Sequence, residues 1–429
     1  MKIGILANYL TTRKDILRFC ENLAEKEEVV LFIRKGEKLV AEKNARLEIR
    51  YYDLKPTSIV IRAWNLIWFY LNILFGVKPK SLNNYIITES FKFSEIDNWL
   101  YRNFRMSLLN MTRYTPQLIS YDTYLRFLRR DVAVDFTGID CYLITTEVYN
   151  DYLFYKILQQ DAPKLMYVYS WDHPCKMIRF SKKIDYYLVW NDELRSDLHL
   201  LQAIPVDKTY VWGATQFTDI YNYLKSKDLL NLVSYSGKYF YFVCATGKRN
   251  LVDAEIELII ELSKVIKSLD PSIKLVVRRY PFWKNSNVYD RLSKSPNIQL
   301  EEDSSNGSYQ KYHSAEGAMA LFHIGTTLGL EICYFNTPSI LLDMSGRTNV
   351  LSTFVHQYQN DKYLNKATFP NVVSSEEQLK NVVQYCISGR NADDLLAYNK
   401  EVAGLTDLRS MEDLTEDFIS ITYKLVKAY

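Results

Sequence analysis

Residues Ala318–Asp343 read AMALFHIGTTLGLEICYFNTPSILLD, a pattern that predicts a strand, a tight turn, a helix and a second strand. The first apolar run ends at Gly325. A helical segment from Leu328 to Phe335 then ends at a second turn, before the apolar run Ser339–Leu342. A strand, a helix and a neighbouring strand form the repeating unit of a parallel sheet. The sequence therefore predicts an α/β fold.

The turn after the first of these strands is a candidate anion site. Gly325, Thr326 and Thr327 would offer free backbone N–H groups and two hydroxyls at the start of a helix, where a phosphate is favoured. Glu331 lies one helical turn further on and is placed to accept hydrogen bonds from a sugar hydroxyl. The alternative is a glycine needed only for the turn and a solvated Glu331. The segment fits neither the dinucleotide pattern G-x-G-x-x-G nor the P-loop pattern.

Length and composition limit the classes of protein to consider. A chain of 429 residues exceeds the usual size of one core and predicts two domains. A net charge of +3 is too small to indicate nucleic-acid binding. The six cysteines are scattered without a C-x-x-C pair or zinc-ligand spacing, which favours reduced thiols and a cytoplasmic protein. The N-terminal MKIGILANYL is too short an apolar run for a signal peptide.

The order of predicted strands and helices divides the chain into two α/β halves. The predicted parts are a first domain at 1–205 with an aromatic and basic helical insertion at about 56–135, an interdomain passage at 206–236, a second domain at 237–405, and a C-terminal helix at 406–429 that crosses back to the first domain. Two doubly wound domains of this kind leave ligand sites at the carboxyl ends of their strands. Polar residues directly after predicted strands are therefore the candidates for function.

Three strand ends in the second half carry residues that suit an anion. They are Gly247, Lys248 and Arg249 after Tyr239–Ala245, then Arg278 and Arg279 after Lys274–Val277, and the turn at Gly325, Thr326 and Thr327. A diphosphate needs a lining of backbone amides, hydroxyls and cations. Each cation alone is more often a solvated surface charge, but the coincidence of three such strand ends favours an anion site.

The first half offers carboxylates and a histidine instead. Asp172 and His173 follow a predicted strand at Leu165–Tyr169, and Glu147 follows its neighbour. These residue types suit acid–base chemistry. The alternatives are that Asp172 caps a turn, as the following proline favours, and that His173 only packs or forms structural hydrogen bonds. Asn191 is predicted to cap the next helix.

Two segments of the first half resemble bacterial surface-polysaccharide glycosyltransferases of the GT-B fold. SWDHP at Ser170–Pro174 precedes a strand that ends in Trp-Asn, and Val189–Tyr221 reads VWNDELRSDLHLLQAIPVDKTYVWGATQFTDIY. In those enzymes a helix, an Ile-Pro turn and a strand ending in Gly-x-x-x-Phe-Asp follow. Here Thr218 intervenes before the aspartate.

The second half is similar to the same enzymes. Arg278-Arg279-Tyr280-Pro281 stands in the place of an Arg-Pro-His-Pro-like turn, with tyrosine replacing the usual histidine. Gly325–Glu331 and Thr337-Pro338 match the donor-binding Gly/Ser-Thr-x-x-x-Glu segment and the small-Pro step after it. The similarity covers about residues 140–345 and the first strand, and it lies in the order and spacing of the motifs.

The resemblance implies two Rossmann-like doubly wound domains facing a central cleft. It implies a cytoplasmic glycosyltransferase that moves a sugar from a nucleotide-sugar donor to a glycan or lipid-linked acceptor, in the synthesis of capsule, O-antigen or lipopolysaccharide. No metal or other cofactor is expected, because helix N-termini and cations neutralise the leaving diphosphate in such enzymes. The donor-binding residues would be Gly247, Lys248, Arg249, Arg278, Arg279, Gly325, Thr326, Thr327 and Glu331, and the catalytic base Asp172, Glu147 or His173.

Two other functional classes remain open from the sequence. A glycerol- or ribitol-phosphate transferase of the teichoic-acid type shares the architecture but typically uses a pair of histidines at the phosphate site, for which His313 and His323 could be offered. A non-catalytic nucleotide-sugar binding protein on the same fold is the second. Retained cations and glycines at all three strand ends speak against it.

The insertion in the first domain has two interpretations. Ile59–Val77 is long enough to span a bilayer, but Arg62, Asn65 and Asn72 interrupt it. It is either part of the core of an enlarged first domain or an interfacial helix. In the second case residues 59–130, which carry many arginines and lysines, would touch anionic headgroups peripherally without spanning the membrane.

Overall fold

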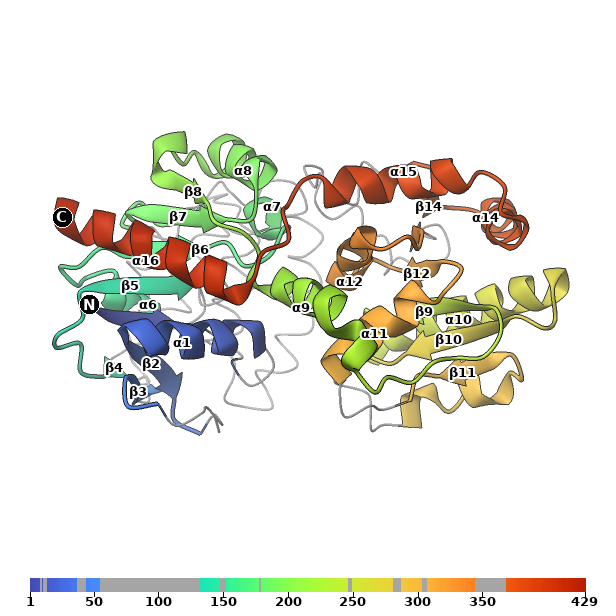
Figure 1. Cartoon of the computed structure of the whole chain (residues 1–429), viewed down its shortest axis with the longest axis horizontal. Helices are drawn as coiled ribbons and strands as arrows, with labels where there is room; N and C mark the ends of the chain where they lie inside the picture. Colours follow the sequence, from blue (N-terminus) through green and yellow to red (C-terminus); the bar gives the residue numbers. More distant parts are fainter. Residues whose placement is uncertain are drawn as a thin grey trace, which may run out of the picture. The chain divides into compact units, whose positions relative to one another are not determined.

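The computed structural model of the chain contains two compact units, each built on a β-sheet (Figure 1). The first unit comprises Met1–Thr218 and Arg409–Tyr429, and the second comprises Asp219–Leu408. The structure describes residues 1–7, 10, 14–36, 44–54, 132–146, 152–176, 179–245, 249–280, 287–302, 307–343 and 368–429. The predicted insertion at about 56–135 therefore lies outside the described residues except for its last four positions.

The first unit holds an eight-stranded sheet with the order β4-β3-β2-β1-β5-β6-β7-β8. Its strands are β1 (Lys2–Leu6), β2 (Glu28–Arg34), β3 (Leu47–Leu54), β4 (Val132–Ala133), β5 (Cys141–Thr145), β6 (Lys164–Tyr167), β7 (Tyr186–Val189) and β8 (Thr209–Val211). Among the described strands of this sheet, the β3–β4 pair alone is antiparallel. The strand order reverses between β1 and β5, which makes their carboxyl ends the switch point of this sheet.

The second unit holds a six-stranded, entirely parallel sheet with the order β11-β10-β9-β12-β13-β14. Its strands are β9 (Tyr239–Val243), β10 (Lys274–Arg278), β11 (Ile298–Leu300), β12 (Leu321–His323), β13 (Ser339–Leu342) and β14 (Val372–Val373). This is the Rossmann-type order, with its switch point between β9 and β12.

Helices connect the strands in both units (Figure 1). In the first unit they are α1 (Lys14–Lys26), α6 (Tyr152–Ile157), α7 (His173–Lys176), α8 (Asp192–Gln202), η3 (Val206–Lys208), η4 (Thr215–Phe217) and α16 (Met411–Ala428). In the second unit they are η5 (Lys227–Leu229), α10 (Arg249–Leu269), η7 (Asn287–Tyr289), η8 (Leu292–Lys294), α11 (Gly307–Glu316), α12 (Thr327–Glu331), η9 (Ile332–Tyr334), α14 (Glu376–Ser388) and α15 (Ala392–Ala403). Helix α9 (Thr218–Ser226) begins at the boundary between the units. Among the described helices, none is both long and apolar enough to cross a membrane.

Strand β9 shows why the second sheet is buried on both faces. All five of its residues are buried, as a central parallel strand requires. Phe240 and Phe242 belong to the same apolar core as Ile256 and Ile259 of α10. Tyr241 points to the opposite face, because side chains alternate along a strand. There its hydroxyl donates to Glu301 over 2.7 Å.

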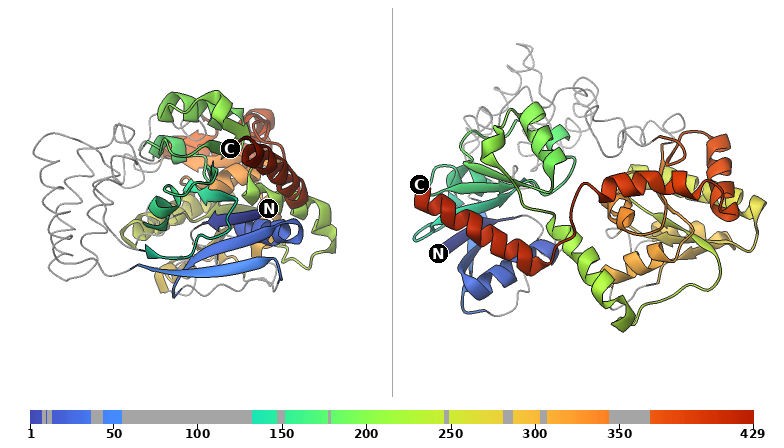
Figure 2. Two further views of the ribbon diagram at one scale, coloured as in Figure 1. Left: turned by 90° about the vertical axis from the view of Figure 1, so that its left-hand side faces the viewer. Right: turned by 45° about the horizontal axis from the view of Figure 1, so that its top comes forward.

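Helix α16 completes the first unit although it lies at the far end of the sequence. Phe418 packs edge-on against Phe19 of α1 with 5.2 Å between the ring centroids, and Trp212 lies 5.1 Å from Phe19. The Trp212 indole N–H donates to the carbonyl of Leu414 over 2.8 Å. Figure 2 shows the same helix, in red, running along the first unit beside the N-terminal elements in both views.

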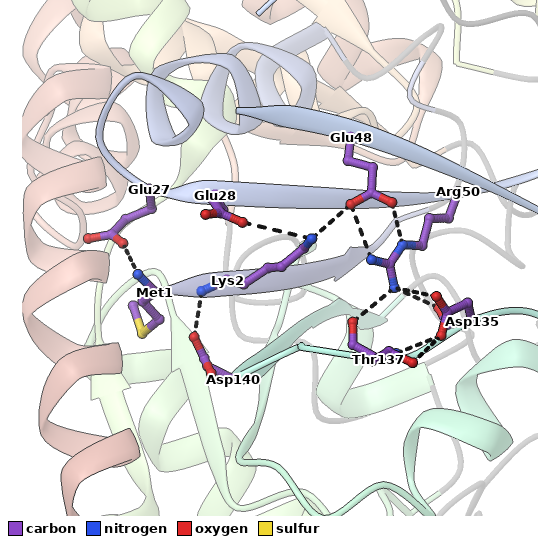
Figure 3. A network of polar contacts seen from close by, with 9 residues as sticks. All are labelled: Met1, Lys2, Glu27, Glu28, Glu48, Arg50, Asp135, Thr137 and Asp140. Atoms are coloured by element: carbon purple, nitrogen blue, oxygen red, sulfur yellow. Dashed lines mark hydrogen bonds and ion pairs between the residues drawn. The ribbon is translucent and has the colours of Figure 1, made fainter. Parts of the chain in front are cut away.

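Charged side chains tie together the amino ends of β1, β2 and β3 (Figure 3). Lys2 Nζ lies 2.9 Å from Glu48, and Arg50 Nε lies 2.7 Å from the same carboxylate. Hydrogen bonds from Arg50 and then Lys2 lower the pKa of Glu48 to about 2. The Met1 amino group pairs with Glu27 over 2.8 Å. This network lies at the edge of the sheet opposite to the carboxyl ends of its parallel strands.

The predicted interdomain passage and the predicted C-terminal segment both contain residues of the first unit. The predicted passage at 206–236 contains β8, η4 and α9, and its residues up to Thr218 belong to the first unit. The predicted C-terminal segment at 406–429 belongs to the first unit from Arg409 onward. The helix predicted over Met411–Val426 is α16, which ends at Ala428.

Candidate functional site

The turn at Gly325 lies at the switch point of the second sheet. His323 ends β12 and pairs in register with Val243, which ends β9, so the segments after both strands leave the sheet at one edge. Gly325 has φ of 109°, a left-handed conformation that glycine adopts without strain. Thr326 and Thr327 are partly exposed at the start of α12. The predicted turn therefore exists at the place where doubly wound sheets bind ligands.

Two backbone amides of this turn, those of Gly325 and Thr326, are not free, contrary to the prediction. The N–H groups of Gly325 and Thr326 donate to Nδ1 of His323 over 3.1 and 3.4 Å. The His323 ring is 1% exposed, and burial lowers its pKa to about 3. The expectation failed because the acceptor is the side chain of His323, the last residue of β12. The apolar pattern of the sequence places this residue in the core.

Glu331 is buried rather than solvated. The residue is 5% exposed, and Oε2 accepts a hydrogen bond from Nζ of Lys311 over 2.6 Å and from the hydroxyl of Tyr312 over 2.9 Å. The other oxygen, Oε1, has no hydrogen-bond partner in the part of the chain that the structure describes. A buried carboxylate with one oxygen held and one available is suited to accept hydrogen bonds from a sugar hydroxyl.

The predicted cations of the second unit differ in their surroundings. Arg278 forms an ion pair with Glu301, which also accepts hydrogen bonds from Tyr241 and Ser314 over 2.7 Å each. Its charge is thus already neutralised inside the protein. Arg279 is partly exposed at the same strand end. Gly247 and Lys248 lie outside the described residues, and Arg249 is the first residue of α10.

A buried glutamate next to the predicted loop was missed by the sequence analysis. Glu255 is 0% exposed, and its Oε1 accepts the N–H of Ala245 over 2.7 Å. It therefore fixes the end of β9 where the segment with Gly247 begins. The available signal was a carboxylate on the apolar face of α10, three residues after Val252 and four before Ile259.

In the first unit, His173 and Thr146 meet at the carboxyl ends of β6 and β5. Oγ1 of Thr146 lies 2.5 Å from Nδ1 of His173, which is 3% exposed. The same oxygen accepts the N–H of Tyr169 over 3.1 Å. Asp172 is less buried, and its Oδ1 accepts the hydroxyl of Ser170 over 2.6 Å. Glu147 lies outside the described residues.

A second carboxylate at this edge was also missed. Asp15 is 6% exposed in the first turn of α1. It accepts hydrogen bonds from the hydroxyl of Tyr169 over 3.1 and 3.2 Å and from Oγ1 of Thr215 over 2.7 Å. In the sequence Asp15 is indistinguishable from an ordinary acid in a first helical turn. Asn191, in contrast, caps α8 as predicted, by accepting the N–H of Leu194 over 2.9 Å.

Comparisons with known proteins show the fold. No protein-family model and no curated protein matches the sequence. The structure is similar to sucrose-phosphate synthase from Thermosynechococcus elongatus, with a TM-score of 0.51 and 10% identity over 100% of both chains. It is similar to S. aureus MnaA solved with UDP, with a TM-score of 0.51 and 11% identity over 99% of this chain and 96% of the other.

A third similar structure is the wall teichoic acid polymerase TagF, with a TM-score of 0.50 and 10% identity over 100% of this chain and 89% of the other. Identities this low carry information on architecture alone. Together with the two parallel-stranded sheets, the similarities establish that the chain has the GT-B fold, with two Rossmann-like α/β domains.

Proposed function

We propose that the protein is a glycosyltransferase that moves a sugar from a nucleotide-sugar donor to a glycan or lipid-linked acceptor in surface-polysaccharide synthesis. The observation that carries the proposal is Glu331. It is a buried carboxylate six residues after the glycine of the switch-point turn, with one oxygen held by Lys311 and Tyr312 and the other available. A ribose with vicinal hydroxyls is the group that such an oxygen would bind.

The donor's phosphates are assigned to the same edge of the second unit. Thr326 and Thr327 supply hydroxyls, and Arg279, Lys248 and Arg249 supply positive charge. Arg278 is a weaker candidate than the sequence suggests, because Glu301 already pairs with it. Charge-assisted hydrogen bonds to phosphate contribute about 1.5–3 kcal/mol each. Arg279→Ala should therefore weaken nucleotide binding roughly tenfold or more.

The acceptor's base is assigned to the first unit. Asp172 is more exposed than His173, so its carboxylate is the better candidate to reach an acceptor hydroxyl. It would take the hydroxyl proton as the acceptor oxygen forms a bond to the anomeric carbon. The bond from that carbon to the diphosphate oxygen breaks, and the nucleoside diphosphate leaves with the electron pair. No metal cofactor is needed if cations of the second unit neutralise the leaving group.

Two of the similar structures support a uridine nucleotide or a nucleotide-sugar as ligand. MnaA was solved with UDP, and a UDP-N-acetylglucosamine 2-epimerase from Rickettsia bellii has a TM-score of 0.50 and 10% identity to this chain. Both epimerisation and sugar transfer use a nucleotide-sugar as substrate. Epimerisation is distinguished from transfer because it needs no acceptor.

The teichoic-acid type of transferase is less well supported. His323 is buried against the Gly325 turn, whereas His313 lies in the last turn of α11. There Nε2 of His313 contacts Oγ of Ser234 over 2.8 Å. The two imidazoles bind different partners and form no contact with each other among the described residues. A paired histidine site for a phosphate is therefore not formed by them.

Binding of UDP, GDP, CDP and CMP, measured by titration calorimetry, tests the proposal first. One nucleotide should bind, and Glu331→Gln should lower the affinity for it. For the 2′-deoxy analogue of that nucleotide, the difference in affinity between wild type and variant should be smaller. Turnover of the matching nucleotide-sugar is then followed with and without a glycan acceptor. Binding of none of the four nucleotides would reject a nucleotide-sugar enzyme. An epimeric nucleotide-sugar formed without acceptor would indicate epimerisation.

Peripheral contact with a membrane or lipid-linked acceptor is proposed for residues 59–130. The support is the sequence alone, an aromatic run followed by many arginines and lysines. Flotation with anionic liposomes tests it: binding that falls with added salt supports contact, and absence of binding at low salt leaves the core interpretation.

A further inference from the structure

The imidazole of His323 is held at both nitrogens. Nδ1 accepts the N–H groups of Gly325 and Thr326 over 3.1 and 3.4 Å. Nε2 lies 3.2 Å from Oγ of Ser339, the first residue of the neighbouring strand β13. The ring thus connects the turn after its own strand to the next strand of the sheet.

The hydroxyl of Ser339 determines the tautomer. Its single proton is donated to the carbonyl of Gly329 over 2.7 Å. Toward His323 the same oxygen can therefore only accept, so Nε2 carries the ring proton and Nδ1 keeps its lone pair. The two backbone donors at Nδ1 require the same tautomer. The structure thus contains a neutral imidazole with every polar atom in use.

Gly329 makes room for this ring in helix α12. A Cβ atom at this position would lie 2.5 Å from Cε1 and Nε2 of His323 and 2.8 Å from Nδ1, closer than real Cβ contacts. Gly329 also donates its N–H to the carbonyl of Thr326 over 2.9 Å. The ring therefore packs directly on the helix backbone, and the turn, the helix and β13 enclose it.

We propose that His323 is a positioning residue of the donor site, which holds the Gly325 turn in its binding conformation without touching the ligand. The inference rests on the proposed function for the identity of that ligand, which is the diphosphate group of a nucleotide-sugar donor. Thr326 and Thr327 remain partly exposed, and their hydroxyls have no partner within the described part of the chain. A turn fixed in advance loses less conformational entropy when it binds, which increases affinity.

This role differs from direct binding of a phosphate by an imidazolium. Direct binding requires a charged, accessible ring, whereas the His323 ring is 1% exposed and both of its nitrogens are occupied. Two amide hydrogen bonds to a neutral acceptor hold the turn in the unbound protein. Their loss is enough to free the turn and to reduce affinity by roughly tenfold.

Two variants separate the acceptor at Nδ1 from the bulk of the ring. In His323→Asn the amide oxygen can accept from the two N–H groups in place of Nδ1. In His323→Leu the side chain fills space but accepts nothing. Nucleotide affinity should fall about tenfold in His323→Leu and at most threefold in His323→Asn. Thermal unfolding of both variants, measured in parallel, confirms that the second unit is folded.

Equal affinity in the wild type and both variants would overturn the inference. So would an equal loss in both, because the acceptor would then be irrelevant. Ser339→Ala is the matched control on the other side of the ring. It removes the acceptor at Nε2 while leaving both amide bonds possible, and its effect on affinity should be smaller than that of His323→Leu.

A spectroscopic test is independent of any nucleotide. With ¹⁵N-labelled histidine the chain gives signals from five imidazoles, and His323→Asn identifies the one that is lost. The His323 signals should show the neutral Nε2–H form unchanged between pH 8 and pH 5. An imidazolium or an Nδ1–H form in that range would reject the inference. If no nucleotide binds to the wild type, the proposed function fails, while this experiment still decides the state of the ring.

Discussion

Nζ of Lys311 lies 2.6 Å from Oε2 of Glu331, and the two side chains are 20% and 7% exposed. The hydroxyl of Tyr312 donates to the same oxygen over 2.9 Å. Because both donors use Oε2, the direction of the carboxylate is fixed and Oε1 is presented in a constant position. The ion pair is thus an orienting device for a candidate ribose-binding oxygen.

Lys311→Met should therefore weaken binding of a ribonucleotide more than binding of its 2′-deoxy analogue. It should also destabilise the second unit by about 1.5–3 kcal/mol, because a hydrogen bond to a charged group is lost in a mostly buried place. Calorimetry with both nucleotides and denaturant unfolding measure the two effects. In the double variant Lys311→Met/Glu331→Gln the loss of stability should be partly restored. An unchanged preference for the ribonucleotide in Lys311→Met would contradict the orienting role.

The buried imidazole of His323 should make the protein less stable in mild acid. Its folded pKa of about 3 lies below the ordinary value of about 6.5 for an unfolded chain, so only the unfolded state takes up a proton between these values. The free energy of unfolding should fall as the pH decreases below 6.5, by about 2 kcal/mol between pH 7.5 and pH 5. Urea unfolding across this range measures it. In His323→Asn this part of the pH dependence should disappear, and its persistence would assign the effect to another group.

Gly329→Ala should destabilise the second unit, although helix propensity alone predicts a gain of about 1 kcal/mol. The reason is the 2.5 Å separation between an added Cβ and the His323 ring. Thermal unfolding decides between the two effects. In a His323→Ala background the ring is absent, so the same substitution should become neutral or stabilising. A gain of stability in the wild-type background would show that the ring can move aside at little cost.

Phe418→Ala should destabilise the first unit by about 3–5 kcal/mol, because the Phe418 ring of α16 is fully buried and packs against Phe19 of α1. The second unit is a separate contiguous segment, so its nucleotide binding should be retained. Differential scanning calorimetry with and without nucleotide measures both. Ser420→Ala, on the exposed side of the same helix, is the control and should have little effect. Loss of nucleotide binding in Phe418→Ala would show that the units do not fold independently.

Asp172→Asn should lower turnover by about 10²–10⁴ while donor binding and thermal stability stay close to wild type. The fold should survive because the asparagine oxygen can still accept the hydroxyl of Ser170. Ser170→Ala is the matched control, since it removes that hydrogen bond but keeps the carboxylate. If Asp172→Asn retains full turnover and Glu147→Gln does not, the role of base belongs to Glu147.

The fold could be predicted because its signals are local and repeated. Parallel strands are buried on both faces, so they appear as short apolar runs, and the run at Ile298–Leu300 coincides with β11. The helix predicted over Met411–Val426 ends two residues later in the structure, since the apolar spacing fixes its face but not its last turn. The capping role of Asn191 was equally local and is confirmed.

The contacts of the candidate site could not be predicted because they depend on residues that the pattern treats as core or surface. His323 lies in an apolar strand, and nothing in the sequence shows that its ring accepts hydrogen bonds from the turn that follows this strand. Arg278 looked like a phosphate-binding cation, but its partner Glu301 lies 23 residues away, directly after β11. Asp15 and Glu255 looked like ordinary helix residues. Their partners, Thr215 and Ala245, become neighbours only when the sheets form.

The place of α16 in the first unit has a consequence for synthesis on the ribosome. The residues around Phe19 and Trp212 are translated long before Phe418, so their aromatic surface stays uncovered until the last helix emerges. The second unit, Asp219–Leu408, is complete by then and can fold as a contiguous domain. The first unit can therefore close only after the second unit has been translated, although most of its residues precede that unit in the chain.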